Sequence, residues 1–394
     1  MDTEKTSVNA QSPNIRSRCL PFFDRSVGTL HELLNTQRSR LKLRTITVTL
    51  SVSALVVVFL GLCLASNEAY AWKGTRSKKI KRIKKTSTVN RTPKPTTKNA
   101  RLAPPSKELL DKATPHVLNA LNHGVISSRD AKDLQAKLGV GAEREWMAVL
   151  ANVAGGFAQI PGTKNAIGAV GKIRGTGEYV IGFNLEFNQH EPSQAVHAEQ
   201  AVVALAHKNK LGPLESIYVT ASPCGNCRQF LMETFSGGNM RVYIEGYAPM
   251  ALSRLLKMPY RGPYGLLKQQ PTPQKLVRTS MADKHNKPLK WAVEAAATSY
   301  IRNKPRHSGI ALETKAGQIY TGANIEISAK KSTLPPLHYA LLGMALDRVS
   351  FKDIRQAFLV ESKGLVFSNA ATTKMLLKTI APGATLNVRM IKSE

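Results

Sequence analysis

Two short stretches are the most informative part of this chain: HAEQ at His197–Gln200 and PCGNCRQ at Pro223–Gln229. One imidazole and two thiolates make a three-ligand set for zinc, and such a set leaves the fourth tetrahedral position open for water. Zinc lowers the pKa of a bound water to about 7. The spacing therefore predicts a catalytic zinc site held by His197, Cys224 and Cys227.

The carboxylate of Glu199 lies two residues after the histidine, where it can move protons without binding the metal. Each half of the motif has a simpler explanation on its own. C-x-x-C occurs in redox pairs and in structural zinc knuckles, and H-x-E on an apolar helix is usually a surface histidine. Cys224 and Cys227 are the only cysteines after residue 65, which excludes a four-cysteine knuckle there. The combination favours catalytic zinc.

The surrounding sequence predicts how the motif is built. QAVHAEQAVVALAHK at 194–208 is typical of a helix, with His197 and Glu199 in its first turns. SIYVT at 216–220 predicts a buried strand, and Pro223 suits the first position of a second helix. Both thiols then lie at a helix N-terminus, where the macrodipole and free N–H groups favour thiolate.

Length and charge limit the class of protein. At 394 residues and 42% hydrophobic content, the chain can hold two ordinary domains and additional segments. Its formal net charge is +30, and nearly half of it lies in residues 1–100. A basic chain can bind nucleic acid or anionic lipid, but for the folded part we expect a soluble basic surface and no nucleic-acid partner. The four cysteines do not indicate a disulfide framework.

An apolar segment at 45–65 has no charged residue and is long enough to span a bilayer. Ala69–Ala71 after it resembles a signal-peptidase site, although the preceding 44 residues are long for a signal peptide. Basic residues at 73–85 would stay in the cytosol by the positive-inside tendency. The sequence thus leaves two interpretations: a membrane anchor with a cytoplasmic catalytic part, and export after cleavage.

Composition divides the chain into seven parts. Residues 66–105 are rich in Lys, Thr and Pro, typical of a disordered linker, and residues 259–281 contain four prolines. Helices are expected within 107–121 and 127–138 and near 143–157. The predicted parts are a basic N-terminal segment (1–44), a transmembrane or signal segment (45–65), a linker (66–105), a helical region (106–145), a catalytic domain (146–258), a linker (259–281) and a C-terminal domain (282–394).

The C-terminal domain contains a second copy of part of the catalytic domain. GFNLE at Gly182–Glu186 recurs as GANIE at Gly322–Glu326, and a β-like segment and a helix-like run precede each copy. This internal repeat predicts a duplicated fold.

The second copy has lost the metal-binding chemistry. Aligning Ala201 with Ala340 places Pro336 where the first copy has its histidine. The same alignment places His338 where the first copy has its glutamate, and no cysteine follows. We therefore expect the C-terminal domain to be a structural partner.

Together these motifs resemble the cytidine deaminase family, in its homodimeric form with a catalytic domain and a degenerate C-terminal copy. The resemblance rests on HAEQ, PCGNCRQ, G-x-N-x-E and TLPPL at Thr333–Leu337, and it runs from about Ser106 to the C-terminus. H-x-E with P-C-x-x-C is the signature of zinc nucleobase deaminases. The family implies an α/β fold of α/β/α layers with a mixed sheet, duplicated and here preceded by a small helical region. It also implies one Zn²⁺ per subunit.

The resemblance implies roles for particular residues. Asn184 and Glu186 would hydrogen-bond the ribose hydroxyls, and a charge-assisted bond of this kind is strong. Glu199 would take the proton of the water that attacks C4 of cytosine, protonate N3 and deliver a proton to the departing ammonia, which is worth about 10²- to 10⁴-fold in rate. The implied activity is deamination of cytidine and 2′-deoxycytidine to uridine and 2′-deoxyuridine, as in pyrimidine salvage.

Two positions depart from the family pattern. Asn165 stands where the family usually has a base-stacking phenylalanine, and Arg261–Pro263 stands where it has aromatic-Gly-Pro. Both bear on base recognition. Asn226 lies between the cysteine ligands and is not itself a ligand.

Two other functions remain open from the sequence. A polynucleotide cytosine deaminase is favoured by the charge of +30 and by Ser222–Cys224. It is opposed by Glu186, because a carboxylate beside the 3′-oxygen would repel a continuing phosphodiester. A non-catalytic, membrane-tethered zinc protein is the third interpretation.

Overall fold

The computed structural model describes residues 103–393 except 235, 261–264, 268–275, 278–285, 302–306 and 365–366. The predictions for the segments 1–44 and 45–65, for nearly all of the linker 66–105, and for Arg261–Pro263 lie outside these residues. Within the described part of the chain, every helix is too short or too polar to cross a membrane.

The described residues 103–260, which we call the first module, form one sheet and the helices that pack against it. The helices are α2 (Lys107–Ala120), α3 (Ser128–Leu138), α4 (Glu143–Gly155), α5 (Ala198–Lys208), α6 (Gly225–Met232) and α7 (Leu252–Leu255). The strands are β1 (Val125–Ile126), β2 (Gly168–Ile173), β3 (Tyr179–Phe183), β4 (Leu214–Val219), β5 (Arg241–Ile244) and β6 (Met250–Ala251). The helices expected near 107–121, 127–138 and 143–157 and the strand expected at 216–220 are thus present.

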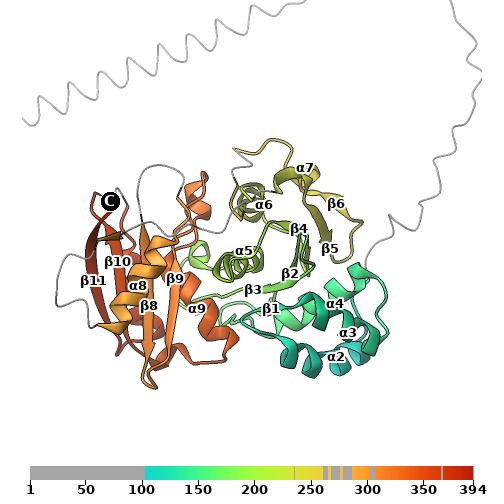
Figure 1. Cartoon of the computed structure of the whole chain (residues 1–394), viewed down its shortest axis with the longest axis horizontal. Coiled ribbons are helices and arrows are strands. Elements are labelled where there is room, and N and C mark those ends of the chain that lie inside the picture. The colour runs from blue at the N-terminus through green and yellow to red at the C-terminus, as the bar shows by residue number, and fades with distance from the viewer. Residues whose placement is uncertain are drawn as a thin grey trace, which may run out of the picture. The chain divides into compact units, whose positions relative to one another are not determined.

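Strand order in this sheet is β1-β3-β2-β4-β5-β6. The pair β4–β5 is parallel and the other pairs are antiparallel, which confirms the predicted mixed sheet. The short strand β1 lies between α2 and α3, inside the region 106–145 that the sequence predicted to be helical. Figure 1 shows these two helices with α4 beside the sheet.

Two glycines of β2 show that helices cover both faces of the sheet. A Cβ on Gly168 would lie 1.8 Å from the carbonyl oxygen of Ala151 in α4, and a Cβ on Gly171 would lie 2.7 Å from Val202 in α5. Side chains three positions apart on a strand point to opposite faces. The helices α4 and α5 therefore pack on opposite sides of β2, in the expected α/β/α layers.

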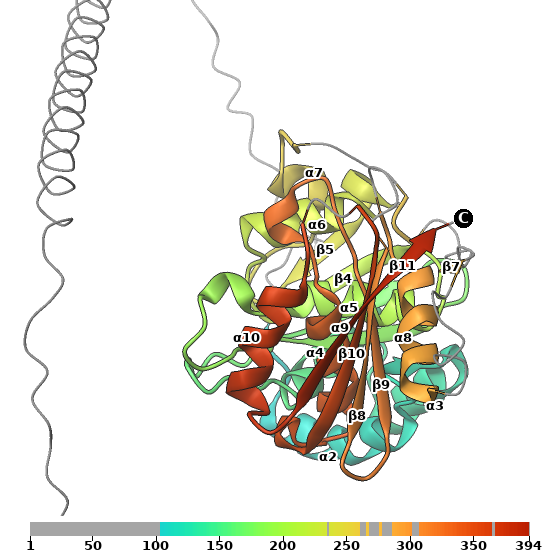
Figure 2. The ribbon, with the colours of Figure 1, turned by 90° about the vertical axis from the view of Figure 1, so that its left-hand side faces the viewer.

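The second module comprises the described residues from 276 onward. It contains α8 (Lys287–Ala297), α9 (Pro336–Leu346), α10 (Ala370–Ile380), β7 (Leu276–Val277), β8 (Ser308–Thr314), β9 (Ile319–Ala323), β10 (Ile354–Ser362) and β11 (Thr385–Ser393). Its strand order is β7-β11-β10-β8-β9. The strands β11, β10, β8 and β9 correspond in order to β5, β4, β2 and β3 of the first module, and β10–β11 is again the parallel pair. Figure 2 shows this sheet with α8 on one side and α10 on the other. The predicted duplication is confirmed.

The structure corrects the alignment of the two copies by one residue. A Cβ on Gly182 would lie 2.3 Å from the carbonyl oxygen of Ala198, and a Cβ on Gly322 would lie 2.1 Å from that of Pro336. These two residues begin α5 and α9, so they are equivalent. The placement of Pro336 at His197 and of His338 at Glu199 was therefore wrong.

In the corrected alignment Pro335 takes the place of His197, and Leu337 takes the place of Glu199. The inference that the second copy lacks the zinc site is unchanged, because neither replacement can bind a metal or carry a proton.

The two modules share one hydrophobic core, which contains buried residues of both sheets and of α5 and α9. Polar contacts cross the same boundary. The hydroxyl of Tyr339 in α9 donates to the carbonyl oxygen of Ala204 in α5 at 2.6 Å and lies 3.2 Å from Nδ1 of His207. Since α5 carries the predicted site, the second module fixes the position of that helix.

Two buried histidines at this boundary predict a dependence of stability on pH. Burial lowers the pKa of both His207 and His338 to about 4, from the ordinary 6.5. Between pH 6.5 and 4 the unfolded chain binds more protons than the folded chain, so the free energy of unfolding falls as the pH falls through this window. We expect a loss on the order of 1–2 kcal/mol per histidine between pH 7 and 5.

Urea denaturation at pH 7 and pH 5 measures this loss. The variant His338→Leu should lose less stability than the wild type over the same interval. An identical pH dependence in wild type and variant would contradict the explanation.

Candidate metal centre

His197 occupies the position immediately before α5, with extended backbone angles, and Glu199 lies in the first turn. The helix was predicted to begin at Gln194, and this start was wrong. The N–H and carbonyl of Val196 instead pair with Leu185, at 2.9 and 3.0 Å, which holds the chain extended up to the histidine. The histidine therefore stands at the helix entrance with its ring free to face α6.

The second half of the motif has the same construction. Cys224 caps α6, and its Sγ accepts a hydrogen bond from the backbone N–H of Cys227. Pro223 was predicted to be the first helical residue, but it precedes the cap. Arg228 holds the turn in place, because its Nε donates to the Pro223 carbonyl at 2.8 Å and a second guanidinium nitrogen donates to the Leu255 carbonyl at 3.2 Å.

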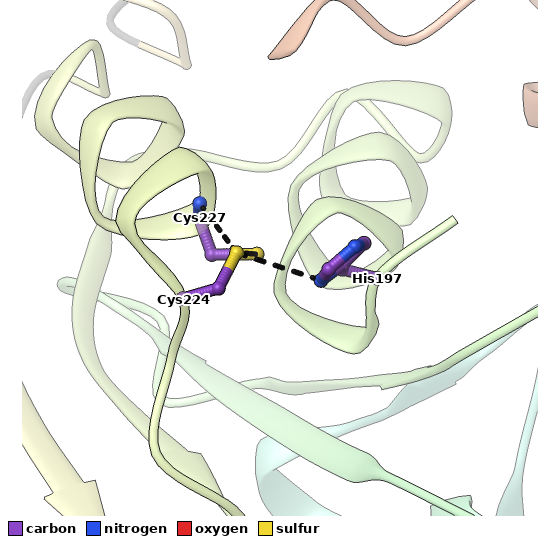
Figure 3. Close-up of side chains that lie close together, drawn as sticks. All are labelled: His197, Cys224 and Cys227. Atoms are coloured by element: carbon purple, nitrogen blue, oxygen red, sulfur yellow. Dashed lines mark hydrogen bonds between the residues drawn. The ribbon is translucent and has the colours of Figure 1, made fainter. Parts of the chain in front are cut away.

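The three predicted ligands converge from the starts of these two helices (Figure 3). Sγ of Cys224 lies 3.7 Å from Nδ1 of His197 and 3.4 Å from Sγ of Cys227. Tetrahedral zinc, with bonds of about 2.3 Å to sulfur and 2.0–2.1 Å to nitrogen, separates its ligand atoms by about 3.5–3.8 Å. The cluster therefore fits zinc with only small adjustments.

The electrostatics of the cluster favour one thiolate. A hydrogen bond with Cys227 lowers the pKa of Cys224 to about 3, while the same bond and burial raise the pKa of Cys227 well above its ordinary value. The hydrogen bond with Cys224 also raises the pKa of His197. Zinc needs both thiols deprotonated, so its binding must release the proton that the pair shares.

Glu199 is buried beside the ligands. It is 3% exposed, and its carboxyl group lies near enough to the Cys227 thiol for the two groups to influence each other's pKa. Burial raises the pKa of this carboxyl group. A buried carboxyl group adjacent to a metal site is well placed to accept a proton and return it.

Asn184 and Glu186 follow β3, and the protein itself already contacts both. Oδ1 of Asn184 accepts from the Ile167 N–H at 2.8 Å, and its Nδ2 donates to the Asn165 carbonyl at 3.0 Å. The Glu186 carboxylate accepts from the hydroxyl of Thr163 at 2.7 Å and from its N–H at 3.0 Å. Each side chain keeps part of its hydrogen-bonding capacity.

Glu186 also lies in the neighbourhood of the metal ligands. Its charge helps to raise the pKa of His197, although less than the hydrogen bond with Cys224 does. The same carboxylate lines a cavity of about 570 Å³ between the modules, together with Phe157 and Arg348. Asn165, at the position of the family phenylalanine, is exposed.

Gln200 is a residue whose role the sequence analysis missed. Its Oε1 accepts from the backbone N–H of His197 at 3.1 Å, and its Nε2 donates to the Ser332 carbonyl of the second module at 3.1 Å. The amide thus connects His197, a predicted metal ligand, to the other half of the chain. A glutamine three residues after a helix cap is a signal for such a bond, but the partner across the boundary could not be read from the sequence.

Replacing Gln200 should weaken zinc binding. In Gln200→Leu the backbone of His197 loses its support, and loss of such supporting bonds typically costs 10- to 100-fold in metal affinity. Competition with a chromophoric chelator measures the affinity of the folded protein. The control Gln318→Leu, at an exposed position of the second module, should bind zinc like the wild type. Equal affinities in all three proteins would show that Gln200 does not position the histidine.

Comparison with known proteins agrees with this geometry. Residues 142–244 and residues 255–374 each match a family model described as "Cytidine and deoxycytidylate deaminase zinc-binding region". A cytidine deaminase of Aliivibrio fischeri is 30% identical over 271 residues, which cover 68% of this chain and 90% of that protein. A cytidine deaminase of Shewanella sediminis is 30% identical over 275 residues, 70% of this chain and 92% of that protein.

Among solved structures, a crystal structure of cytidine deaminase from Mycobacterium tuberculosis aligns along its whole length with 31% of this chain, at 26% identity and a TM-score of 0.29. The two family-model matches cover parts of both modules, the relatives match along most of their own lengths, and the predicted metal ligands converge as the motif requires. The chain belongs to the cytidine deaminase family, in its two-domain form.

Proposed function

We propose that this chain is a zinc-dependent cytidine deaminase, which hydrolyses cytidine and 2′-deoxycytidine to uridine and 2′-deoxyuridine with release of ammonia. The observation that carries the proposal is the cluster of His197, Cys224 and Cys227 with the buried Glu199 against it. A structural zinc site would have four protein ligands and no need for an adjacent carboxyl group.

The reaction exchanges the amino group at C4 of cytosine for a hydroxyl oxygen from water. When held by the three ligands, zinc supplies a Lewis acid that lowers the pKa of a water molecule to about 7. Glu199 accepts the proton of this water and passes it to N3 as the C4–O bond forms. Glu199 then takes the proton of the new C4 hydroxyl group and delivers it to the amino group as the C4–N bond breaks, which leaves the C4 carbonyl of uracil and ammonia. Its burial keeps bulk water away from both transfers.

We further propose that Asn184 and Glu186 bind the ribose. The Glu186 carboxylate accepts two hydrogen bonds within the protein and retains lone pairs for substrate hydroxyls. Asn184 retains one amide N–H for the same purpose. The bonds from Thr163 and the loop backbone would then orient the two side chains for the sugar.

The domain boundaries, the assembly and the cellular location also belong to the proposal. We propose residues 146–258 as the catalytic domain and 282–394 as the degenerate copy, in a homodimer that acts in pyrimidine salvage. The segment 45–65 is proposed as an anchor that leaves the catalytic part in the cytoplasm, or as a cleaved export signal.

A polynucleotide substrate is the alternative that the net charge of +30 favours. A nucleoside and a polynucleotide would interact differently with Glu186, because its carboxylate would repel the 3′-phosphodiester of a polynucleotide. Assays of purified protein on cytidine and on a single-stranded oligodeoxynucleotide separate them. We expect turnover of cytidine, and turnover of the oligonucleotide alone would refute the proposal.

The variant Glu199→Gln should retain zinc and lose activity. The amide keeps the shape of the side chain but cannot carry the proton, so kcat for cytidine should fall by at least about 10²- to 10⁴-fold. Elemental analysis of the purified variant should find one zinc per chain. A variant with substantial residual turnover would show that another group moves the proton.

The variant Glu186→Gln should mainly raise KM for cytidine. A hydrogen bond to a charged group contributes about 1.5–3 kcal/mol, so kcat/KM should fall by about tenfold or more. The matched control Glu178→Gln changes a carboxylate whose Oε2 accepts from Thr176 in an exposed turn, and it should leave kcat/KM unchanged. A KM that is the same in Glu186→Gln as in the wild type would remove Glu186 from the binding site.

A further inference from the structure

The second module contains a cavity of its own, with a volume of about 300 Å³. Among the described residues it is lined by Asn324, Glu326, Lys330, Thr333, Phe367 and Asn369. This volume is at the lower end of the range for small-molecule sites. Most of the lining side chains can accept hydrogen bonds, so the cavity suits a ligand that carries several hydroxyl groups.

The internal repeat places this cavity where the first module has its substrate side. Asn324 and Glu326 follow β9 as Asn184 and Glu186 follow β3. Asn369 lies immediately before α10, the position that Cys224 has before α6. The second copy has therefore kept the residues that we propose to bind the sugar and has replaced those of the predicted metal site.

Among the described residues of the second copy, those that stand in for the metal-binding histidine and the proton-carrying glutamate have lost this chemistry. Pro335 stands at the position of His197, and Leu337 stands at the position of Glu199. Because the second copy lacks the metal ligand set and the proton-carrying carboxylate, a molecule that binds in this cavity would dissociate from it unchanged.

The strongest observation is a buried acceptor that has no partner. Asn324 is 5% exposed and lines the cavity, yet its Oδ1 accepts no hydrogen bond. In the first module, Oδ1 of Asn184 accepts from the Ile167 N–H. The hydroxyl of Thr333, which lines the same cavity, is also buried without a partner. Such unsatisfied groups are costly, and each calls for a polar ligand atom.

The charged groups of the lining agree with a neutral, hydroxyl-rich ligand. Glu326 supplies a carboxylate, and the Lys330 ammonium group lies 4.9 Å from the centre of the Phe367 ring. The carboxylate can accept from a sugar hydroxyl, Asn324 from a second hydroxyl or N–H, and Thr333 can donate or accept. A nucleoside offers these groups on one face of its ribose.

We propose that the second module binds a nucleoside through its ribose hydroxyls and does not convert it. The choice of a nucleoside rests on the proposed function, because the sugar-binding role of Asn184 and Glu186 is part of it. The cavity itself, with its unsatisfied acceptor, is independent of that function.

Equilibrium dialysis of the full chain against labelled uridine, up to about 1 mM, tests the proposal. Uridine is used because it is the product and is not consumed. We expect the wild type to bind one equivalent more than Thr333→Val and one more than Asn324→Leu. The first substitution removes a hydroxyl that has no partner, so it should not impair folding, and the second removes the open acceptor.

Two controls keep the result interpretable. Thr385→Val, at an exposed position of β11, should bind uridine like the wild type, and all variants should deaminate cytidine within about twofold of the wild type. Equal uridine binding by the wild type and both cavity variants would overturn the proposal. If the wild type does not deaminate cytidine, the proposed function is overturned instead.

Discussion

The burial of α5 from Ala198 to His207 is the constraint on which the rest of the structure depends. Every residue from Ala198 to His207 is buried, including the charged Glu199 and the polar Gln200. A helix with no exposed face needs cover on all sides. Its own sheet provides one side, where Gly171 and Gly182 leave no room for a side chain. The second module provides another through α9, which is itself buried from Pro336 to Ala345.

This burial explains why a copy without metal ligands remains part of the chain. An uncovered α5 would expose the apolar surface of its Ala, Val and Leu side chains and leave the Gln200 amide without its partner across the boundary. The contact through Tyr339, which reaches Ala204 and His207, belongs to the same boundary. The proposed catalytic chemistry thus lies in one module, whereas the packing that holds α5 comes from both.

The sequence predicted the chemistry of the site better than its geometry. HAEQ and PCGNCRQ predict the ligands because zinc restricts the residue types and their spacing, and the structure brings the three predicted ligands together. Helix starts were harder to predict. Gln194 has good helical neighbours in sequence, but the pairing of Val196 with Leu185 delays the helix until Ala198, and this tertiary contact has no local signal. The one-residue error in the repeat alignment also has no local signal. GFNLE and GANIE align strand β3 with β9, but they do not predict the lengths of the loops that lead from these strands to α5 and α9. Strand β1 is two residues long and becomes a strand only by pairing with β3.

The bond between Gln200 and the second module has a consequence for how the two copies can diverge. Its acceptor is a main-chain carbonyl, at Ser332, so the amino acid at position 332 does not itself supply the acceptor. Mutations in this part of the second copy can accumulate, provided that the backbone keeps its path. A duplicated half can in this way lose its own active site during evolution while selection for the shape of its main chain continues.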